Sequence, residues 1–274
     1  MAATHDHTPP TPGRAIAWVD GRVLPASDAT VPLTDEGFLR GDAVFEAVLV
    51  RGGRTHALEP HLARLERSAR AIDLPLPPVR RAVADLLAAW GERDGALRII
   101  VTRGGAVRGI LGGVSWPPTI SLALVAAPWR TAISGVKTLS YAANQWALRQ
   151  ARARDADDAL IVDGGLLHEL PTGALLLVTD GQVTTPDPGK LPILDSVTVQ
   201  ALGQIVEVEQ ATPDVDTLRA ADEVFVVSAT RPVLPVHAVL FEGEEEVEYP
   251  APGPVTARLQ EAFAAHVLAN LDDG

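Results

Sequence analysis

The sequence predicts an α+β protein built from β-hairpins and separate helices, and three observations point to this fold class. Short apolar strand candidates are joined by glycine turns such as Asp20-Gly21 and Asp163-Gly164-Gly165, which are typical of hairpins. Apolar residues recur at helical spacing in separate segments, for example after Pro60. Strands and helices do not alternate as in a series of βαβ units, so a doubly wound sheet is not expected.

The first half of the chain holds the elements of a smaller N-terminal domain, which we expect over residues 14–125. Its expected elements, in chain order, are strands Ala15–Val19, Arg22–Leu24, Val44–Val50 and Thr55–Leu58, a helix opened by Pro60, a helix from Pro78 to Trp90, and strands Ala96–Thr102 and Thr119–Val125. The last two strands are expected to pair around the glycine-rich loop Arg103–Gly113. Residues 1–13 are expected to be a disordered tail.

A linker is expected over residues 126–135, because this segment contains Pro128 and shows little periodicity. A larger C-terminal domain is expected over residues 136–274. Its expected elements are a helix Leu139–Arg154, hairpin strands Ala159–Val162 and Leu166–His168, hairpin strands Leu175–Val178 and Gln182–Thr184, a helix Val197–Val206, a strand Glu223–Val227 and a helix Val255–Leu268.

The composition narrows the classes of function. The 274 residues include 23 Lys+Arg and 35 Asp+Glu, and the net charge of −12 argues against binding to nucleic acid or to an anionic membrane surface. Cysteine is absent, which excludes disulfides, a thiolate nucleophile and a Cys-ligated zinc. We find no signal peptide, no membrane-spanning run and no metal motif, so a cytoplasmic protein with a small-molecule substrate is expected.

Only two of the 23 basic residues are lysines, Lys137 and Lys190. The neighbours of Lys137 are small or apolar, and burial there would lower the pKa of its amine. A neutral amine is what Schiff-base formation with an aldehyde requires. The alternative is a lysine at a helix start whose stem is buried and whose amine lies in water. Lys190 lies in a loop rich in proline and glycine and is expected to be exposed.

Four other sites have polar residues that a ligand could contact. Glu169 could pair with a protonated heterocyclic nitrogen, or it could face water at a sheet edge. Arg64 could bind a phosphate through two parallel hydrogen bonds, or it could face solvent. The helix start Ser196-Val197-Thr198 could bind an anion or could be a capping motif alone. The loop Arg103–Gly113 could be an arginine-bearing active-site loop or a plain surface hairpin.

Several short motifs, taken in chain order, resemble those of one family. The motifs are Gly41-Asp42-Ala43-Val44-Phe45-Glu46, His61-Leu62-Ala63-Arg64-Leu65, Lys137, Glu169, Thr184-Thr185-Pro186 and Ile193-Leu194-Asp195-Ser196-Val197-Thr198. This ordered set resembles the class IV pyridoxal-phosphate aminotransferases and lyases, from about Ala17 to His237. The resemblance implies the two-domain fold type IV of D-amino-acid aminotransferases, with pyridoxal 5'-phosphate (PLP) between the domains, and a homodimer.

The resemblance also implies roles for residues at the cofactor. Lys137 would bond covalently to PLP and later move a proton between the substrate Cα and the cofactor. Glu169 would pair with the protonated pyridine nitrogen and so keep the ring an electron sink. Arg64, Val197 and Thr198 would hold the phosphate.

Five further residues have implied roles around the same cofactor. Ser228 and Thr230 fall where the family adds contacts to the phosphate or substrate. Tyr141 lies near the position of the family's tyrosine that faces the phenolic oxygen of PLP. Phe45 and Glu46 would lie on the substrate side.

Two departures from the transaminase pattern lie beside the expected cofactor pocket. The stretch after the glutamate is Leu170-Pro171-Thr172-Gly173-Ala174, where transaminases carry a serine-rich stretch ending in asparagine. The family's Gly-Ile-Thr-Arg motif is replaced by Ser196-Val197-Thr198-Val199, which lacks the arginine. Because neither change removes the lysine or the glutamate, we expect PLP binding to be kept and substrate choice to differ.

Within the family, the closest likeness is to 4-amino-4-deoxychorismate lyases, which form the folate precursor 4-aminobenzoate and pyruvate. The likeness rests on the string Gly95–Gly104, the string Lys137–Tyr141 and the short length of 274 residues. Arg103 and Arg108 are then the candidates for the substrate carboxylates. The alternatives are a transaminase acting on branched-chain or D-amino acids, and a non-catalytic homologue. The sequence leaves open whether Glu36 and Arg40 reach the site.

Overall fold

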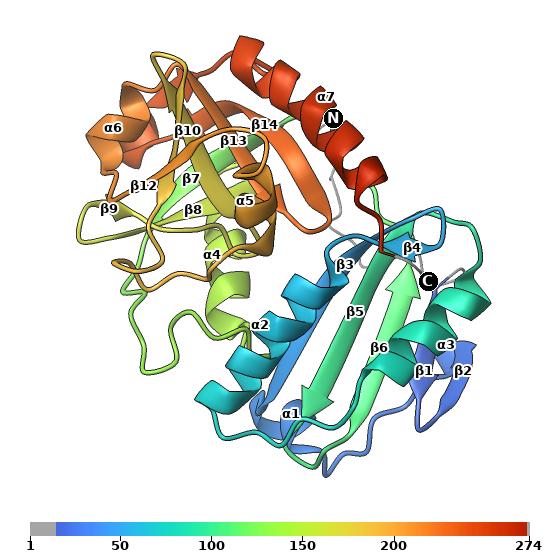
Figure 1. The fold of residues 1–274 in the computed structure, drawn as a ribbon. Coiled ribbons are helices and arrows are strands. Elements are labelled where there is room, and N and C mark those ends of the chain that lie inside the picture. Colours follow the sequence, from blue (N-terminus) through green and yellow to red (C-terminus); the bar gives the residue numbers. More distant parts are fainter. Residues whose placement is uncertain (1–14, 273–274) are drawn as a thin grey trace. The chain divides into compact units, whose positions relative to one another are not determined.

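The computed structural model describes residues 15–272 (Figure 1), so the predicted disordered tail over residues 1–13 lies outside the described residues. The chain folds as two compact units, which are described separately. Unit 1 contains the residues up to Ser115, the segment Val136–Tyr141 and the residues from Val267 onward. Unit 2 contains Trp116–Gly135 and Ala142–His266.

Unit 1 contains one antiparallel sheet with the strand order β2-β1-β6-β5-β3-β4. The strands are β1 (Ile16–Val19), β2 (Arg22–Pro25), β3 (Ala43–Arg51), β4 (Arg54–Thr55), β5 (Gly95–Thr102) and β6 (Val107–Gly112). The helices are η1 (Ala26–Asp28), α1 (Glu36–Arg40), α2 (Leu58–Ala71) and α3 (Arg80–Trp90). The predicted Asp20-Gly21 turn is confirmed, since both residues have the positive φ angles (50° and 83°) that a tight hairpin turn needs.

The core of unit 1 lies on the face of the sheet that α2 and α3 cover. Val44 and Val48 of β3 pack there against Leu65 of α2 and Leu86 of α3. Alternate residues of a strand point to the same side, so Glu46 shares this face and is 0% exposed. The strand therefore carries a carboxylate into an apolar core.

Unit 2 contains a nine-stranded mixed sheet with the order β12-β11-β10-β13-β14-β7-β8-β9, and β15 pairs with β14. The strands are β7 (Ile120–Ala126), β8 (Asp158–Asp163), β9 (Leu166–Leu167), β10 (Ala174–Thr179), β11 (Gln182–Pro186), β12 (Val208–Ala211), β13 (Glu223–Ser228), β14 (Arg231–Leu240) and β15 (Glu246–Glu248). The helices are α4 (Ala142–Arg152), α5 (Val197–Leu202), α6 (Val215–Arg219), η2 (Glu242–Glu244) and α7 (Pro254–Ala269), whose last residues fall in unit 1.

The expected pairing of the strands Ala96–Thr102 and Thr119–Val125 is wrong. β5 pairs with β6, which forms within the predicted loop Arg103–Gly113, and not with β7. β7 instead pairs in parallel with β8 and β14 in unit 2. Because α4 connects the parallel strands β7 and β8, the fold does contain a βαβ crossover within its α+β architecture.

Helix α1, which the sequence analysis did not predict, contains Glu36 and Arg40, the two residues whose access to the site the sequence leaves open. Its N-terminus is capped by Asp35, whose carboxylate accepts a hydrogen bond from the Gly37 N–H at 2.8 Å. Glu36 and Arg40 form an ion pair with each other on the surface of this helix. Among residues 15–272, no helix combines the length and the apolar character needed to cross a bilayer.

Candidate active site

The segment Val136–Tyr141 runs beside β3 in unit 1 and carries Lys137. Its backbone pairs with the strand, because the Phe45 N–H donates to the Lys137 carbonyl at 3.1 Å. Helix α4 begins only at Ala142, so the prediction of a helix over Leu139–Arg154 is wrong at its start. Lys137 is therefore held by extended backbone instead of by a helix start.

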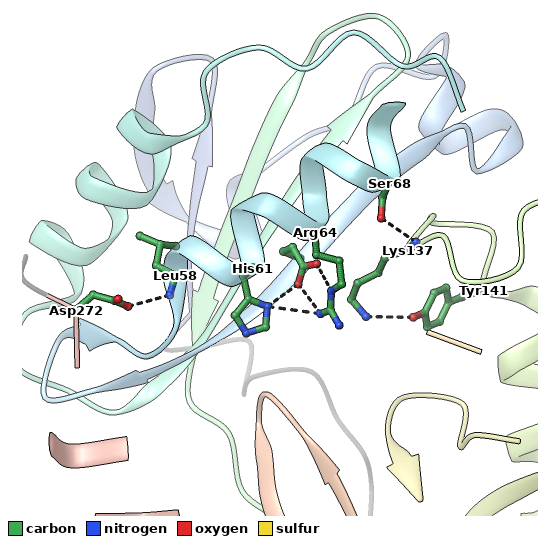
Figure 2. Close-up of polar contacts among 8 residues, drawn as sticks. Leu58, His61, Arg64, Ser68, Lys137, Tyr141 and Asp272 are labelled. Atoms are coloured by element: carbon green, nitrogen blue, oxygen red, sulfur yellow. Dashed lines mark hydrogen bonds and ion pairs between the residues drawn. The ribbon is translucent and has the colours of Figure 1, made fainter. Parts of the chain in front are cut away.

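The Lys137 amine lies among aromatic rings. Its Nζ is 3.5 Å from the Tyr141 hydroxyl, a contact drawn in Figure 2, and 4.6 Å from the ring centre of Phe45. The rings of Phe45 and Tyr141 pack edge to face with centres 5.2 Å apart. The Lys137 N–H donates to the Ser68 hydroxyl of α2 at 3.2 Å. In the part of the chain that the structure describes, no carboxylate forms an ion pair with Lys137.

Lys190 has a different environment in unit 2. Its Nζ lies 3.4 Å from a carboxylate oxygen of Asp187, and its side chain is 66% exposed. Such surface ion pairs contribute little to stability. The predicted exposure of Lys190 is confirmed, so of the two lysines only Lys137 has an amine in an aromatic environment.

Glu46, which is expected with Phe45 on the substrate side, has a fully buried carboxylate. Arg64 donates to it from Nε at 2.7 Å and from Nη2 at 2.9 Å, and His61 Nδ1 lies 2.8 Å from the carboxylate (Figure 2). Burial would raise the pKa of Glu46, but hydrogen bonds from Arg64 and His61, with the charges of Arg64 and Lys137, lower it to about 2. The carboxylate is therefore ionised at neutral pH and offsets the buried guanidinium charge.

The position of Arg64 limits how it can bind a phosphate. It is buried on the same face of α2 as His61, three residues earlier, so the solvent-facing alternative does not apply. The Nε and Nη2 edge of its guanidinium is engaged by Glu46. The contact of Arg64 with a phosphate therefore stays a prediction.

Arg103 has a structural role in unit 1. Its Nε and Nη2 donate to the Asp42 carboxylate at 2.8 and 3.0 Å, Nη2 also donates to the Ile72 carbonyl, and Nη1 donates to the Asp73 carbonyl. The hydrogen bond with Asp42 raises the pKa of Arg103. Because all three nitrogens have acceptors, the structure does not support the predicted contact of Arg103 with substrate carboxylates.

Arg108 keeps some of its hydrogen-bonding capacity. Its Nη1 donates to the Asp20 carboxylate at 2.9 Å and to the Val107 carbonyl at 2.8 Å. Its Nε is buried and has no acceptor among the described residues. A buried donor without an acceptor is costly unless a water or a ligand completes it, so Arg108 remains a candidate substrate contact.

Arg98 of β5 is a further candidate that the sequence analysis missed. Its guanidinium lies 5.0 Å from the ring centre of Phe45, and the strand register places it opposite Ala47 on the same sheet face. Desolvation lowers the pKa of Arg98, while the charge of Tyr141 opposes this shift. No described residue forms an ion pair with it. The available signal was a charged residue within the apolar run Ala96–Thr102.

Glu169 follows β9 in unit 2 and is held by two donors. Trp129 Nε1 donates to one carboxylate oxygen at 3.1 Å, and the Leu194 N–H donates to the other at 3.1 Å. The side chain is half-buried, so it is not the water-facing edge residue of the alternative interpretation. These two hydrogen bonds hold the carboxylate, and its contact with a pyridine nitrogen stays a prediction.

The predicted anion site at Ser196 begins helix α5. The Ser196 hydroxyl accepts a hydrogen bond from the Val199 N–H at 3.3 Å, which is the capping arrangement. Val197 and Thr198 are buried in the first turn. Capping is thus observed, and phosphate binding by Val197 and Thr198 stays a prediction.

The predicted site residues fall into one set in each unit. Unit 1 carries Phe45, Arg64, Arg103, Arg108, Lys137 and Tyr141, and unit 2 carries Glu169, Val197, Thr198, Ser228 and Thr230. The structure brings Phe45, Lys137 and Tyr141 into direct contact. Across residues 15–272, no cluster of three His, Asp or Glu side chains could hold a metal ion.

Comparison with protein families and characterised sequences gives consistent matches. The family model for amino-transferase class IV matches residues 43–239. A bifunctional aminodeoxychorismate lyase / D-amino acid transaminase of Mycobacterium tuberculosis is 35% identical over 243 residues, which span 76% of this chain and 83% of that protein. A D-alanine aminotransferase of Bacillus licheniformis is 28% identical over an alignment 276 residues long, gaps included, which covers 91% of this chain and 96% of that protein.

Solved structures show the same fold. The PLP-bound form of a hypothetical aminotransferase from Mycobacterium tuberculosis matches with a TM-score of 0.80 and 28% identity, covering 93% of this chain and 99% of that one. A fold IV-transaminase from Curtobacterium pusillum matches with a TM-score of 0.81 and 28% identity, covering 92% and 99%. The predicted fold type and the predicted cofactor are confirmed. The chain belongs to the amino-transferase class IV family of PLP-dependent enzymes.

Proposed function

We propose that the protein converts 4-amino-4-deoxychorismate to 4-aminobenzoate and pyruvate, a reaction that supplies a folate precursor. The observation that carries PLP-dependent chemistry is the Lys137 amine, 3.5 Å from the Tyr141 hydroxyl and without a carboxylate partner among the described residues. Such an amine fits covalent attachment of the PLP aldehyde. The Mycobacterium tuberculosis relative that is named a lyase as well as a transaminase supports the choice within the family.

PLP attached at Lys137 supplies an electron sink for the substrate carbon that carries the amino group. Lys137 is then the proposed base, because its amine can take the proton from that carbon. The bond between the ring carbon and the ether oxygen then breaks. The three-carbon group leaves with that oxygen and takes up a proton to become pyruvate, and the ring becomes aromatic. The Tyr141 hydroxyl, 3.5 Å from Nζ, holds the amine in position.

Other residues would orient the cofactor. Glu169 would accept a hydrogen bond from the pyridine nitrogen, and Trp129 and Leu194 aim its carboxylate by their two hydrogen bonds. Tyr141 would also face the phenolic oxygen of PLP. The residues proposed to bind the phosphate are Arg64, Val197, Thr198, Ser228 and Thr230.

The substrate contains carboxylates, and two arginines of unit 1 fit them. Arg108 has a buried Nε without an acceptor among the described residues, and Arg98, an exposed residue of β5, has its guanidinium beside the Phe45 ring. Arginine forms paired hydrogen bonds with carboxylates. We therefore propose Arg98 and Arg108 as the carboxylate contacts, with the Phe45 ring on the substrate side.

Transamination is the second candidate function, and D-amino acids or branched-chain amino acids would be its substrates. The same Mycobacterium tuberculosis relative is also named a D-amino acid transaminase, and the Bacillus licheniformis relative is a D-alanine aminotransferase. Both reactions begin with proton removal from the carbon that carries the amino group, so Lys137 would serve either one.

We also propose that the enzyme is a homodimer, as the family resemblance implies, and that it acts in the cytoplasm. Light scattering coupled to size-exclusion chromatography checks the assembly. A mass near twice the monomer value of 28.9 kDa is expected, and a purely monomeric active enzyme would contradict this proposal.

A pair of substrate assays tests the proposed reaction. The PLP-loaded enzyme is incubated with aminodeoxychorismate in one assay, and with D- or branched-chain amino acids plus 2-oxoglutarate in the other. Release of 4-aminobenzoate and pyruvate in equal amounts is expected in the first. Glutamate in the second assay without 4-aminobenzoate in the first would replace the lyase proposal by the transaminase one.

A further inference from the structure

Arg231, the first residue of β14, is a fully buried arginine to which the sequence analysis gave no role. Its side chain is 0% exposed, and Nη1 donates to the Asp158 carboxylate at 2.8 Å. Nη2 donates to the Thr172 hydroxyl at 2.6 Å, and the guanidinium carbon lies 4.5 Å from the ring centre of Trp116. One guanidinium thus joins segments of unit 2 that are far apart in the sequence.

The ion pair with Asp158 does not explain this arrangement by itself. A buried ion pair is often no more stable than apolar side chains of similar volume, because both charges must be desolvated. A lysine could also neutralise Asp158. Only the planar fork of arginine presents donors to Asp158 and Thr172 at once in a fixed geometry. The distinctive contribution of Arg231 is therefore its bond to Thr172.

Thr172 lies in the turn that directly follows Glu169. The Leu170 N–H donates to the Gly173 carbonyl at 2.9 Å and closes this turn. A Cβ atom at Gly173 would lie only 3.0 Å from Nη2 of Arg231. The turn is thus packed closely around the guanidinium, and its position depends on where Arg231 holds it.

The backbone of Arg231 holds a second turn. Its N–H donates to the Ser228 hydroxyl at 3.2 Å, in the connection between β13 and β14 that also contains Thr230. A single residue therefore contacts the turn after Glu169 with its side chain and the Ser228–Arg231 turn with its backbone. In the proposed function these turns contact opposite ends of PLP, the ring nitrogen and the phosphate.

We propose that Arg231 is a positioning residue for the cofactor, which acts through Thr172 to hold the Glu169 carboxylate in register with the Ser228–Arg231 turn. The proposed role of Arg231 rests on the proposed role of Glu169 and not on the lyase reaction, because both roles concern the binding of PLP alone. A preorganised turn lowers the cost of binding. We call the hydrogen bond between Arg231 and Thr172 the tether. Without the tether, the turn Leu170–Gly173 that follows Glu169 can adopt positions in which the contact of Glu169 with the ring nitrogen is lost.

Thr172→Val tests the tether, since it removes the hydroxyl acceptor and leaves the Arg231–Asp158 pair intact. The dissociation constant of PLP, measured by absorbance titration of the full-length protein, is expected to rise about 10-fold, as for loss of a hydrogen bond to a charged group. The affinity for inorganic phosphate, which probes only the phosphate end, is expected to stay unchanged. Thr172→Ser keeps the hydroxyl and is expected to retain PLP affinity.

The Glu169→Gln background shows whether the tether acts through Glu169. If it does, Thr172→Val causes no further loss of PLP affinity in that background, because the contact it positions is already impaired. An equal loss in both backgrounds would overturn the proposal. So would unchanged PLP affinity in Thr172→Val, or wild-type PLP affinity in Glu169→Gln alone.

Tyr249→Phe is the matched control for stability. It removes another buried hydroxyl hydrogen bond of unit 2, from Tyr249 to the Leu218 carbonyl at 2.8 Å. It is expected to lower the thermal midpoint without changing PLP affinity. If it weakens PLP binding as much as Thr172→Val does, the effect is a general loss of stability and the proposal fails. A negative lyase assay leaves these binding measurements unaffected, so the two proposals can fail separately.

Discussion

The surroundings of Lys137 and of Lys190 differ in ways that decide what each amine can do. Lys137 lies on extended backbone paired with β3, and its amine contacts the aromatic residues Phe45 and Tyr141. Lys190 lies in a turn, with 66% of its side chain exposed and Asp187 as its ion-pair partner. The first amine is immobilised without a carboxylate partner among the described residues, whereas the second is solvated and paired.

The comparison indicates that the reactivity of a lysine amine depends on the charged groups around it as well as on its place in the fold. A carboxylate bonded to an ammonium favours the charged form, which cannot attack an aldehyde. Near Lys137 the carboxylate of Glu46 is instead engaged by Arg64 and His61. The Glu46 carboxylate is therefore paired with Arg64, and among the described residues it forms no ion pair with Lys137.

The largest expected effect comes from exchanging each lysine for alanine. Lys137→Ala removes the proposed base and the site of PLP attachment, so the rate of 4-aminobenzoate formation should fall at least about 10³-fold. Lys190→Ala, the matched control, should keep wild-type activity. Steady-state kinetics measure both. Comparable losses in the two variants would mean that the contrast between the lysines has no functional meaning.

The next effect concerns the charge balance beside Lys137. Glu46→Gln leaves Arg64 without its buried carboxylate, so the free energy of unfolding at neutral pH should fall by about 3 kcal/mol. Glu59→Gln is the control, because Glu59 pairs with Arg80 in the same two-bond manner but both side chains are 64% exposed. It should leave the denaturation midpoint nearly unchanged. A large loss in both variants would show that burial is not the deciding factor.

The acid titration of Glu46 sharpens this result. Its pKa is lowered from 4.5 to about 2 in the folded protein, so between these values the unfolded chain binds more protons. The stabilisation from Glu46 is complete above about pH 4.5 and is lost as the pH falls towards 2. The difference in unfolding free energy between wild type and Glu46→Gln should shrink over that range. A difference that stays constant would contradict the proposed ion pair.

A smaller effect is expected on the substrate side of Lys137. Arg108→Gln removes a carboxylate contact, which should raise KM about 10-fold or more with little change in kcat. Arg103→Gln is the comparison, since Asp42 and backbone carbonyls already occupy Arg103. It should leave KM unchanged. A rise in KM for Arg103→Gln alone would restore the original prediction from the sequence.

The smallest effect is expected for Tyr141→Phe. The hydroxyl lies at 3.5 Å from Nζ, a long hydrogen bond, so its loss should reduce kcat by about 3- to 10-fold. The edge-to-face packing of this ring on Phe45 is retained. Asp187→Asn, which alters the partner of Lys190, should leave kcat unchanged. An equal change in both would remove the distinction between the lysine environments.

The sequence predicts the local elements better than their pairing. The alternation in β3 and the helical spacing in α2 and α7 depend on near neighbours, and these elements lie where expected. The pairing of β7 with β8 and β14 depends on contacts across long stretches of chain, which local patterns do not encode. The start of α4 was misplaced because the Ser140 N–H bonds to the Thr138 hydroxyl at 3.3 Å and competes with helix formation.

The candidate site shows the same limit. Lys137 could be found because lysine is scarce and its neighbours carry no charge, and Arg64 and Glu169 because they stand in ordered motifs. The hydrogen bonds between Arg64 and Glu46 could not be predicted, because they depend on how α2 packs against β3. The proposed role of Arg231 could not be predicted from the sequence, because it depends on contacts of Arg231 with Asp158 and Thr172, which are distant in the chain. The order of residue types in the sequence therefore identifies the residues that could react or bind a ligand. The residues that contact and position them are found only from the three-dimensional structure.

Chemical mapping of the cofactor tests the central claim most directly. The PLP-loaded enzyme is reduced with borohydride and digested, and the peptide that carries the pyridoxyl group is identified by mass spectrometry. The reduced cofactor is expected on Lys137 alone. Labelling of Lys190, or of both lysines in equal amounts, would contradict the assignment of Lys137 as the residue that holds PLP.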